Sequence, residues 1–374
     1  MNNIRVDLIA AARPNFMKVA PLYHALKAAK WCDVRLIHTG QHYDANMSDS
    51  FFEDFSLPAP DIHLEVGSGS HAEQTGKVMA AYERVCLSTP PDWVIVVGDV
   101  NSTVACALAA VKLGIRVAHL EAGLRSRDRS MPEEINRLVT DAIVDLLWTP
   151  SKDGDENLIA EGVPVDKIDF VGNIMLDAFE LVRDKIKTAN AAARLGLLVE
   201  EFGVVTLHRP SNVDDPDILA ILVNQLVAAS RHLPLIFAVH PRTRGRLEST
   251  GLIARLAAAD DIYLIDPLGY IEFMSLVTRA RVAITDSGGI QEETTYLGIP
   301  CLTLRNNTER PITLTEGTNQ LVKPEKLLDA LVEALATADA AKPSPELWDG
   351  RAAPRIVESL RKHARMDQRV IAEV

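Results

Sequence analysis

The chain has 374 residues, 47% of them hydrophobic and 24% charged, which is enough for roughly two domains with large cores. This composition excludes a disordered, collagen-like or disulfide-scaffold protein. The formal net charge is −12 and no basic tract concentrates the positive charge, so neither nucleic acid nor a membrane is expected as a partner. The four cysteines form no CxxC pair, and no apolar run approaches a membrane span, which predicts a cytoplasmic protein without a zinc site.

Short apolar runs alternate with amphipathic segments along almost the whole chain. The predicted strands of the first half are Ile4–Ala11, Val34–Thr39, Trp93–Val97, Arg116–Leu120, Leu146–Thr149 and Asp169–Val171. Those of the second half are Gly203–Leu207, Leu235–Val239, Ile262–Ile265, Val282–Thr285 and Cys301–Leu304. Most of these runs are continuous in Val and Ile, which is typical of strands covered on both faces. Alternating strands and helices therefore predict an α/β protein with two doubly wound, Rossmann-like parallel sheets that face a cleft.

The predicted domain boundary follows the last strand of the first series. Residues 1–172 form the first predicted domain and residues 173–349 the second, with a helix at Ile174–Lys187 leading from one to the other. Residues 350–374 contain a predicted terminal helix, Arg355–Arg369. This helix either packs back on the first domain or caps the second.

Ionisable residues follow five of the predicted strands, where parallel sheets place their ligands. The segments that carry them are Gly98-Asp99, His119–Arg125, His208-Arg209-Pro210, His240-Pro241-Arg242 and Asp286–Gly289. A scaffold or a binding repeat needs only Gly and Asn turns after its strands, without ionisable side chains. The pattern therefore favours an enzyme with its site between two domains.

The segment Asp286–Glu293 is the strongest phosphate-binding signal in the sequence. Gly288 and Gly289 let a phosphate approach the backbone, and the following helix supplies free N–H donors and a positive dipole end. Glu293 lies about one and a half turns further on, in reach of a ribose diol. The alternative is an ordinary strand–turn–helix in which Asp286 or Ser287 caps the helix.

Two basic residues near the N-terminus form a second, weaker anion signal. Arg13 and Lys18 flank the start of the first predicted helix, and both side chains can turn toward the cleft and neutralise a diphosphate. Solvated surface charges would produce the same pattern.

Three carboxylates differ in whether a purely structural role explains them. Asp99 has none, because Asn101 or Ser102 is better placed to cap the next helix. A buried salt bridge between Glu121 and Arg125 is as good an explanation of Glu121 as catalysis. For Glu133, stabilising a helix dipole and pairing with the residue four positions on, Arg137, is the favoured explanation from sequence physics alone.

Two histidines follow strands of the second half. His208 follows its strand directly and is placed for catalysis, with a structural histidine as the alternative. His240 carries less weight, since a buried, hydrogen-bonded histidine before Pro241 is an equally good explanation.

Several of these motifs occur together, and in order, in a known family. The segments are Val97-Gly98-Asp99, His119–Arg125 (HLEAGLR), Pro132-Glu133-Glu134, Asn136-Arg137, Asp286–Glu293 (DSGGIQEE), Thr308–Pro311 and Asp349–Ala352. In these segments the chain resembles the bacterial non-hydrolysing UDP-N-acetylglucosamine 2-epimerases over nearly its whole length. That family has the GT-B architecture of two Rossmann-like domains, with a C-terminal helix that crosses back.

The resemblance implies a reaction and a set of residues. The reaction is the interconversion of UDP-GlcNAc and UDP-ManNAc, through elimination of UDP to a 2-acetamidoglucal and its re-addition. The residues that match the family's catalytic positions are Asp99, Glu121, Glu133 and His208. Those that match substrate-binding positions are Arg13, Lys18, Arg137, His240, Ser287, Gly288, Gly289, Glu293 and Arg310. For Glu133, the match reverses the conclusion drawn from helix physics.

The resemblance further implies a homodimer that uses no nicotinamide and no metal. Two departures leave the exact sugar and the family's substrate-activation site open. Ala11-Ala12-Arg13-Pro14-Asn15 stands where Gly-Thr-Arg-Pro-Glu is common, and Ser211 replaces a Glu of the activation site, which Gln41-His42 otherwise resembles. The alternatives are a hydrolysing epimerase that releases ManNAc, an epimerase of a modified UDP-sugar, a GT-B glycosyltransferase and a non-catalytic sensor.

Overall fold

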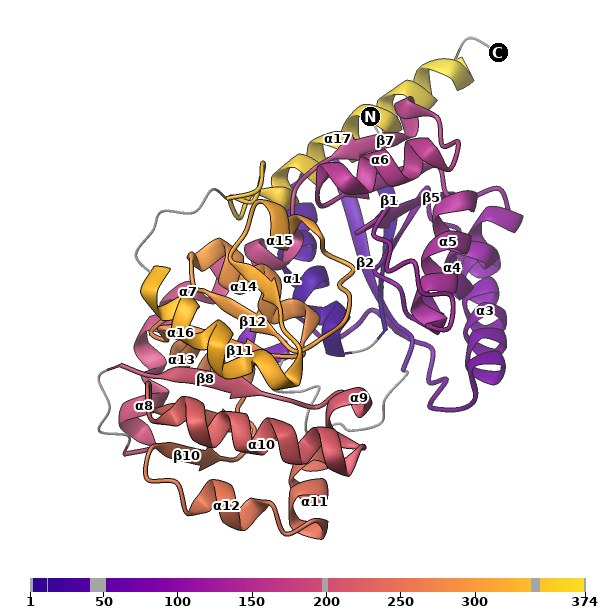
Figure 1. The fold of residues 1–374 in the computed structure, drawn as a ribbon. Helices are drawn as coiled ribbons and strands as arrows, with labels where there is room; N and C mark the ends of the chain where they lie inside the picture. Colours follow the sequence, from indigo (N-terminus) through magenta and orange to yellow (C-terminus); the bar gives the residue numbers. More distant parts are fainter. Residues whose placement is uncertain (1–2, 12, 41–51, 197–200, 338–343, 373–374) are drawn as a thin grey trace. The chain divides into compact units, whose positions relative to one another are not determined.

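The computed structural model describes residues 3–11, 13–40, 52–196, 201–337 and 344–372. The chain forms two compact units, Met1–Leu181 with Glu346–Val374, and Val182–Pro345 (Figure 1). Helix α7 (Ile174–Ala189) begins in the first unit and ends in the second. The boundary expected from the sequence, after residue 172, lies just before this helix.

The first unit is built on a parallel sheet with the strand order β3-β2-β1-β4-β5-β6-β7. Its strands are β1 (Ile4–Ala10), β2 (Cys32–His38), β3 (Ile62–His63), β4 (Trp93–Val97), β5 (Arg116–Leu120), β6 (Leu146–Thr149) and β7 (Ile168–Phe170). Every residue of β4 and β6 is buried, as expected for strands with helices on both faces. The strand order reverses between β1 and β4, which opens a crevice at their carboxyl ends.

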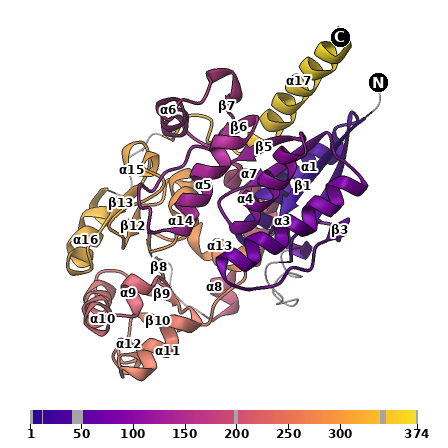
Figure 2. The same ribbon diagram turned by 90° about the vertical axis from the view of Figure 1, so that its right-hand side faces the viewer.

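The helices of the first unit follow the strands in sequence. They are α1 (Arg13–Ala28), α3 (His71–Ser88), α4 (Asn101–Lys112), α5 (Pro132–Ile143), α6 (Lys152–Ala160), the short 3₁₀ helix η1 (Val165–Lys167) and the terminal α17 (Ala352–Ala372). Helix α4 packs against both α3 and α5, while α17 packs against α1 (Figure 2). The first N–H groups of α17, those of Ala352 and Ala353, donate to the carboxylate of Asp177 at 2.9 and 2.8 Å. Burial raises the pKa of Asp177 to about 6.

The second unit has a smaller parallel sheet with the strand order β10-β9-β8-β11-β12-β13. Its strands are β8 (Gly203–Thr206), β9 (Leu235–Ala238), β10 (Ile262–Ile265), β11 (Val282–Thr285), β12 (Cys301–Thr303) and β13 (Asn319–Leu321). Its helices are α8 (Ala191–Arg194), α9 (Pro210–Val213), α10 (Pro216–Ser230), α11 (Pro241–Ser249), α12 (Ile253–Ala257), α13 (Tyr270–Val277), α14 (Gly288–Leu297), α15 (Ile312–Thr315), η2 (Pro324–Lys326) and α16 (Leu327–Thr337). The order reverses between β8 and β11, so the loops after these two strands border the crevice of this sheet.

The predicted fold class is confirmed, and the two strands missed by the sequence-based prediction are short. β3 and β13 have two and three residues, include polar side chains and each pair with one neighbouring strand at the end of a sheet. Strands of this kind carry no apolar run, because their place is set by the neighbour to which they hydrogen-bond.

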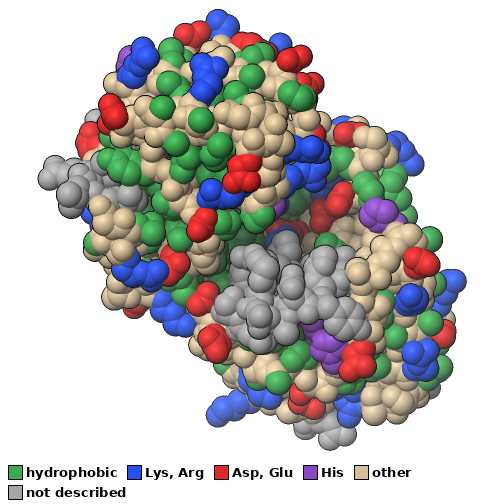
Figure 3. Space-filling view, turned by 90° about the horizontal axis from the view of Figure 1, so that it is seen from below, with side chains coloured by type: hydrophobic (Ala, Val, Ile, Leu, Met, Phe, Trp, Pro, Cys, Tyr) green, Lys and Arg blue, Asp and Glu red, His purple; other side chains and the backbone are tan. Residues whose placement is uncertain are grey.

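The cysteines are free and buried, with Cys32, Cys86 and Cys106 in the first unit and Cys301 in the second. Burial raises the pKa of Cys32 to about 12 and that of Cys301 to about 11. On the face shown in Figure 3, acidic and basic side chains are interspersed without an extended patch of one sign. No helix in the described ranges is long and apolar enough to cross a membrane.

Candidate functional site

In the first unit, Arg137 binds the predicted catalytic residue Asp99 but not Glu133. Arg137 of α5 donates through Nη1 to Asp99 at 2.5 Å and through Nε and Nη2 to Glu134 at 3.0 and 2.8 Å. The predicted pairing of Arg137 with Glu133 is therefore wrong, because Glu134 occupies the guanidinium. Glu133 is half-buried in the first turn of α5, and within the described residues no hydrogen bond or ion pair is recorded for it.

Glu121 forms a buried ion pair with Lys18 of α1. Both side chains are largely hidden, with 4% of the Glu121 side chain and 11% of that of Lys18 exposed. The alternative salt bridge from Glu121 to Arg125 is wrong, since Arg125 binds Asp141 at 2.8 Å and Glu161 at 2.7 Å. The four-residue spacing brings side chains together in a helix, whereas here a turn with positive φ at Glu121 separates the two.

His119 connects the turns that carry Asp99 and Glu121. Its ring is fully buried, with Nδ1 at 2.6 Å from Asp141 and Nε2 at 2.8 Å from the carbonyl oxygen of Gly98. Through these two contacts His119 joins the loop after β4 to α5. Although burial alone would raise it, His119 and Arg125 hold the pKa of Asp141 below its usual range. This supporting role was not predicted.

The start of α1 is fixed to the end of β4. The side-chain amide of Asn15 donates to the carbonyl of Val97 at 2.9 Å. Arg13 is the first residue of α1, and its side chain lies outside the described part of the structure, as do Gln41 and His42. Of the two predicted phosphate-neutralising groups, the structure therefore describes only Lys18, in its pair with Glu121.

The predicted caps of α4 are absent, since Val100 is the N-cap residue and makes no side-chain bond.

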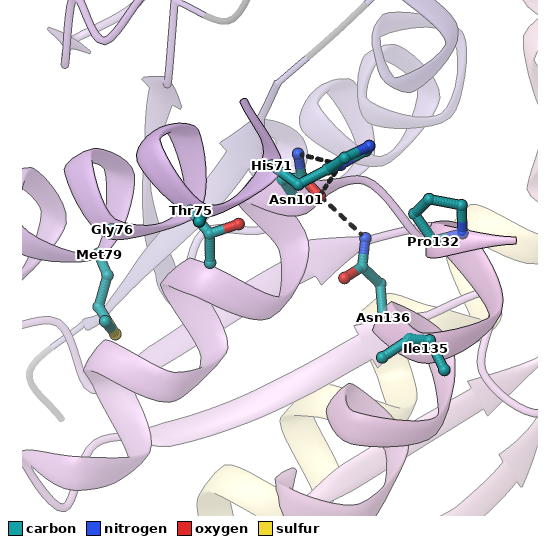
Figure 4. A pocket seen from close by; sticks show the side chains of 9 residues that line it. His71, Thr75, Gly76, Met79, Asn101, Pro132, Ile135 and Asn136 are labelled. Atoms are coloured by element: carbon teal, nitrogen blue, oxygen red, sulfur yellow. Dashed lines mark hydrogen bonds between the residues drawn. The ribbon is translucent and has the colours of Figure 1, made fainter. Parts of the chain in front are cut away.

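A pocket of about 550 Å³ opens beside the Asp99 turn, between α3, α4 and α5 (Figure 4). His71, Asn101 and Asn136 line its polar side and hydrogen-bond to one another. Asn136 also donates to the backbone carbonyl of Asp99 at 2.8 Å. The side-chain amide of Asn136 thus ties the wall of this pocket to the turn that carries a predicted catalytic carboxylate.

In the second unit, His208 follows β8 and contacts the aspartate that follows β11. Nδ1 of His208 lies 2.8 Å from Oδ1 of Asp286, whose side chain is fully buried, while 40% of the His208 side chain is exposed. Asp286 also accepts bonds from the backbone N–H of His208 and Arg209 and from the amide of Asn212. The sequence places Asp286 in the phosphate-binding segment, with a helix cap as the alternative, but Ser287 is the N-cap residue and the contact with His208 was not predicted.

His240 lies beside His208, with 5.7 Å between the ring centroids. Nδ1 of His240 accepts the backbone N–H of Arg242 at 3.2 Å, which leaves Nε2 as the donor in the neutral ring. Burial, and then the neighbouring His208, lower the pKa of His240. His240 is exposed and caps α11 through Nδ1, so the buried histidine of the structural alternative is wrong, and Nε2 remains a hydrogen-bond donor.

Ser287, Gly288 and Gly289 form the start of α14. Ser287 is the N-cap residue but makes no side-chain bond to the helix, so the N–H groups of the first turn are available to an anion. Arg310 lies over this turn, since its Nη1 is 3.0 Å from the position that a Cβ on Gly288 would occupy. Nε of Arg310 is held by Glu292 at 2.9 Å. A side chain at position 288 would press on the end of the Arg310 guanidinium, which would have to shift by a few tenths of an ångström.

Glu293 is buried further along α14 and accepts the hydroxyl hydrogen of Tyr270 at 2.8 Å. Burial, with a smaller contribution from Glu292, raises the pKa of Glu293 to about 8, although Tyr270 opposes the shift. The ribose contact of Glu293 stays a prediction. Tyr270 was not predicted, because it comes from α13 and no motif signals it.

Arg209 and Arg305 add positive charge beside Arg310, and neither was predicted as a site residue. Arg305 binds Glu309 at 3.0 and 3.1 Å, and Arg209 donates through Nε to the carbonyl of Asp286 at 3.1 Å. Although burial opposes it, Arg305 and Arg310 hold the pKa of Glu309 at about 2. Across the described ranges, no group of three or more His, Cys, Asp or Glu side chains is arranged to hold a metal ion.

Comparison with known proteins gives a consistent result. A family model described as UDP-N-acetylglucosamine 2-epimerase matches residues 24–361. The UDP-N-acetylglucosamine 2-epimerase of Methanocaldococcus jannaschii is 42% identical over 364 residues, which cover 96% of this chain and 99% of that protein. The UDP-2,3-diacetamido-2,3-dideoxy-D-glucuronate 2-epimerase of Pseudomonas aeruginosa is 38% identical over 366 residues, covering 96% and 100%.

The fold agrees with a solved structure of the same kind. A crystal structure of the M. jannaschii UDP-GlcNAc 2-epimerase, in complex with UDP-GlcNAc and UDP, matches with a TM-score of 0.85 and 41% identity. The match covers 96% of this chain and all of that chain.

Two Rossmann-like units, each with polar groups at the carboxyl edge of its sheet, define a nucleotide-sugar enzyme of the GT-B class. Within that class, the chain belongs to the UDP-N-acetylglucosamine 2-epimerase family. The family expected from the motifs and the epimerase activity are confirmed, and the glycosyltransferase and sensor alternatives are set aside.

Proposed function

We propose that the protein interconverts UDP-GlcNAc and UDP-ManNAc without releasing free sugar. The observation that carries this proposal is the 42% identity to a UDP-N-acetylglucosamine 2-epimerase over nearly the full length of both chains. The C2 proton beside an acetamido group is not acidic, so its direct removal and return is implausible. Elimination avoids this problem, because the C1–O bond to UDP breaks as the C2 proton leaves.

The proposed reaction has two balanced steps. In the first, a carboxylate accepts the C2 proton, the C–H electron pair forms the C1=C2 bond of a 2-acetamidoglucal, and the C1–O pair leaves with UDP. In the second, UDP adds back to C1 while an acid delivers a proton to the opposite face of C2. The 2-acetamidoglucal and UDP both stay bound between the two steps, since an escaping glycal would end the reaction.

Residues of the second unit are proposed to hold the nucleotide. His208 would protonate or hydrogen-bond the leaving diphosphate, and the N–H groups at Ser287–Gly289 would share its charge. Arg13, from the first unit, is proposed to add a positive charge to the diphosphate. Glu293 would bind the ribose diol. His240, through Nε2, and Arg310, which lies over the start of α14, complete the proposed set.

The carboxylates of the first unit are proposed to act on the sugar. Asp99, Glu121 and Glu133 would supply the base, the acid on the opposite face and the stabilisation of positive charge at C1. Lys18 and Arg137 would act through their ion pairs with Glu121 and Asp99. A Glu121→Gln variant that retains full turnover would remove that residue from the scheme, and Asp99→Asn and Glu133→Gln test the others.

One experiment tests the reaction class. The protein is incubated with UDP-GlcNAc in heavy water, and the C2 proton is followed by NMR. Deuterium at C2 of both UDP-linked epimers supports the proposal. Free ManNAc with UDP identifies a hydrolysing enzyme instead, and an exchange that leaves the glycosidic C1–O bond intact, detected by a positional isotope label, overturns the elimination.

A second substrate is favoured by one observation. The P. aeruginosa relative, which is 38% identical over its whole length, acts on a UDP-sugar with two acetamido groups and a uronic acid carboxylate. We therefore propose UDP-2,3-diacetamido-2,3-dideoxy-D-glucuronate as the alternative substrate. Running the deuterium experiment with both sugars at equal concentration separates them, since the preferred one exchanges with the higher kcat/KM.

We further propose that the enzyme acts in the cytoplasm as a homodimer, as the family resemblance implies. The mass of one chain is 40.9 kDa, so light scattering should give twice this value. A monomer mass across the working concentration range would contradict the dimer.

A further inference from the structure

The histidine proposed to meet the leaving diphosphate is held from behind by a buried carboxylate. Oδ1 of Asp286 lies 2.8 Å from Nδ1 of His208 and also accepts the backbone N–H of His208 at 3.1 Å. The Asp286 side chain has no exposed surface, whereas two fifths of the His208 side chain is exposed. Since the two ring nitrogens point in opposite directions, the contact at Nδ1 leaves Nε2 for the exposed side.

The second oxygen of Asp286 has a separate set of donors. Oδ2 accepts the backbone N–H of Arg209 at 2.9 Å, the side-chain amide of Asn212 at 3.0 Å and the backbone N–H of His208 at 3.0 Å. Although burial opposes it, His208 and these donors hold the pKa of Asp286 below its usual range. Asp286 is therefore an acceptor at both oxygens.

We propose that Asp286 is a positioning residue that fixes His208 as the Nδ1–H tautomer and directs Nε2 toward the diphosphate of the substrate. The inference rests on the proposed function, in which His208 serves the leaving group. A buried carboxylate behind a histidine does the same in hydrolases of unrelated fold, where it selects the tautomer and stabilises the protonated ring. The competing explanation is that Asp286 only anchors the loop between β8 and α9.

The two oxygens give Asp286→Asn a defined consequence. Two donors from other residues face Oδ2, so the carbonyl oxygen of the new amide takes that side. Its NH₂ group then faces Nδ1 of His208, which must become an acceptor. The variant thus keeps the contacts at Oδ2, gives up the bond from the His208 N–H to Oδ1, and reverses the tautomer.

The first experiment measures the tautomer by ¹⁵N NMR, in protein with labelled histidine and with a His208→Gln variant for assignment. In the wild type, at a pH where the ring is neutral, we expect Nδ1 of His208 to carry the proton. In Asp286→Asn we expect the proton on Nε2. A wild-type ring protonated on Nε2 overturns the inference, and this result requires neither a folded variant nor an active enzyme.

The second experiment compares turnover with a matched control. Asn212→Ala removes one donor to Oδ2 and a bond to the carbonyl of Leu304, but leaves the contact with His208. We expect Asp286→Asn to lower kcat by about 100-fold or more with KM changed less than about 5-fold, the range of a misdirected acid–base group. Asn212→Ala should lower kcat by less than about 5-fold.

The outcomes separate this inference from the function on which it rests. If the wild type exchanges the C2 proton and both variants lose the same activity, Asp286 only anchors the loop and the inference is wrong. If the wild type exchanges nothing with either UDP-sugar, the proposed function fails, while the NMR result still decides the tautomer.

Discussion

At the scale of single residues, the Lys18–Glu121 pair joins a proposed substrate-binding group to a proposed catalytic one. Both side chains are buried in the first unit, and each is the ion partner of the other. Taking a charge out of water is costly, so either group alone would be poorly accommodated at this position. The pair therefore affects stability as well as catalysis.

We predict that Lys18→Met lowers the free energy of unfolding by about 3 kcal/mol, because it removes the ammonium group that pairs with the buried carboxylate of Glu121. The double variant Lys18→Met/Glu121→Gln should lose less than the sum of the single losses. Urea unfolding with a double-mutant cycle measures both effects. Lys152→Met is the control in the same unit, since its pair with Glu346 is exposed and is expected to contribute about 0–1 kcal/mol. Equal losses from Lys18→Met and Lys152→Met would contradict the prediction.

The raised pKa of Glu293 predicts how the free energy of unfolding depends on pH. Its pKa in the folded protein is about 8, against an ordinary 4.5, so between these values the native state holds a proton that the unfolded chain has lost. The contribution of Glu293 is complete below pH 4.5 and falls as pH rises toward 8, by up to about 1.4 kcal/mol per pH unit.

Glu293→Gln should therefore gain stability relative to the wild type as pH rises, because the amide never ionises. Urea unfolding at several pH values in this interval measures the difference. Glu325→Gln, at an exposed position in the same unit, should follow the wild type at every pH. A difference between Glu293→Gln and the wild type that does not change with pH would count against the buried, protonated carboxyl.

At the scale of elements, the loop after β5 is shaped by its contact with α6. Gly123 has φ +80°, and a Cβ there would lie 2.4 Å from the carbonyl oxygen of Gly154 in α6. The loop carries Glu121 at its start, so the close approach of this helix helps to place a proposed catalytic group. Gly114 has nearly the same φ, +72°, but no atom within 4 Å of its Cβ position.

We predict that Gly123→Ala is clearly more destabilising than Gly114→Ala. Both substitutions force an L-residue into the left-handed region, at about 1–2 kcal/mol. Only Gly123→Ala also drives a methyl group into a backbone carbonyl, which should add on the order of 2 kcal/mol. Thermal and urea unfolding compare the two, and similar losses would show that α6 moves aside freely.

The elements also show which parts of the structure are predictable from sequence. β4 and β11 have the predicted bounds, because a run rich in Val and Ile and covered on both faces has few alternatives. Once the strands are located, the ionisable residues that follow them are located as well. The side chains that these residues contact were not predictable. Glu121 pairs with Lys18 and not with Arg125, because the turn at Glu121 has a positive φ that no spacing rule describes.

At the scale of the whole molecule, three of the four buried thiols lie in the first unit and one in the second. Thiolates are the reactive form, and burial raises the pKa values of all four. A disulfide reagent should therefore modify each cysteine only when its surroundings open. Mass spectrometry of labelled peptides measures the four rates separately, and a rate at Cys301 equal to that of a free thiol would contradict its burial.

UDP should slow the labelling of Cys301 if the nucleotide binds the second unit. At a concentration 100 times its Kd, a ligand that binds only the closed form stabilises it by about 2.7 kcal/mol, or roughly 100-fold in rate. The natural distribution of the thiols thus provides an intrinsic reporter for each lobe of the enzyme. Local opening of either lobe, with and without nucleotide, can be timed on the unmodified protein with no engineered probe.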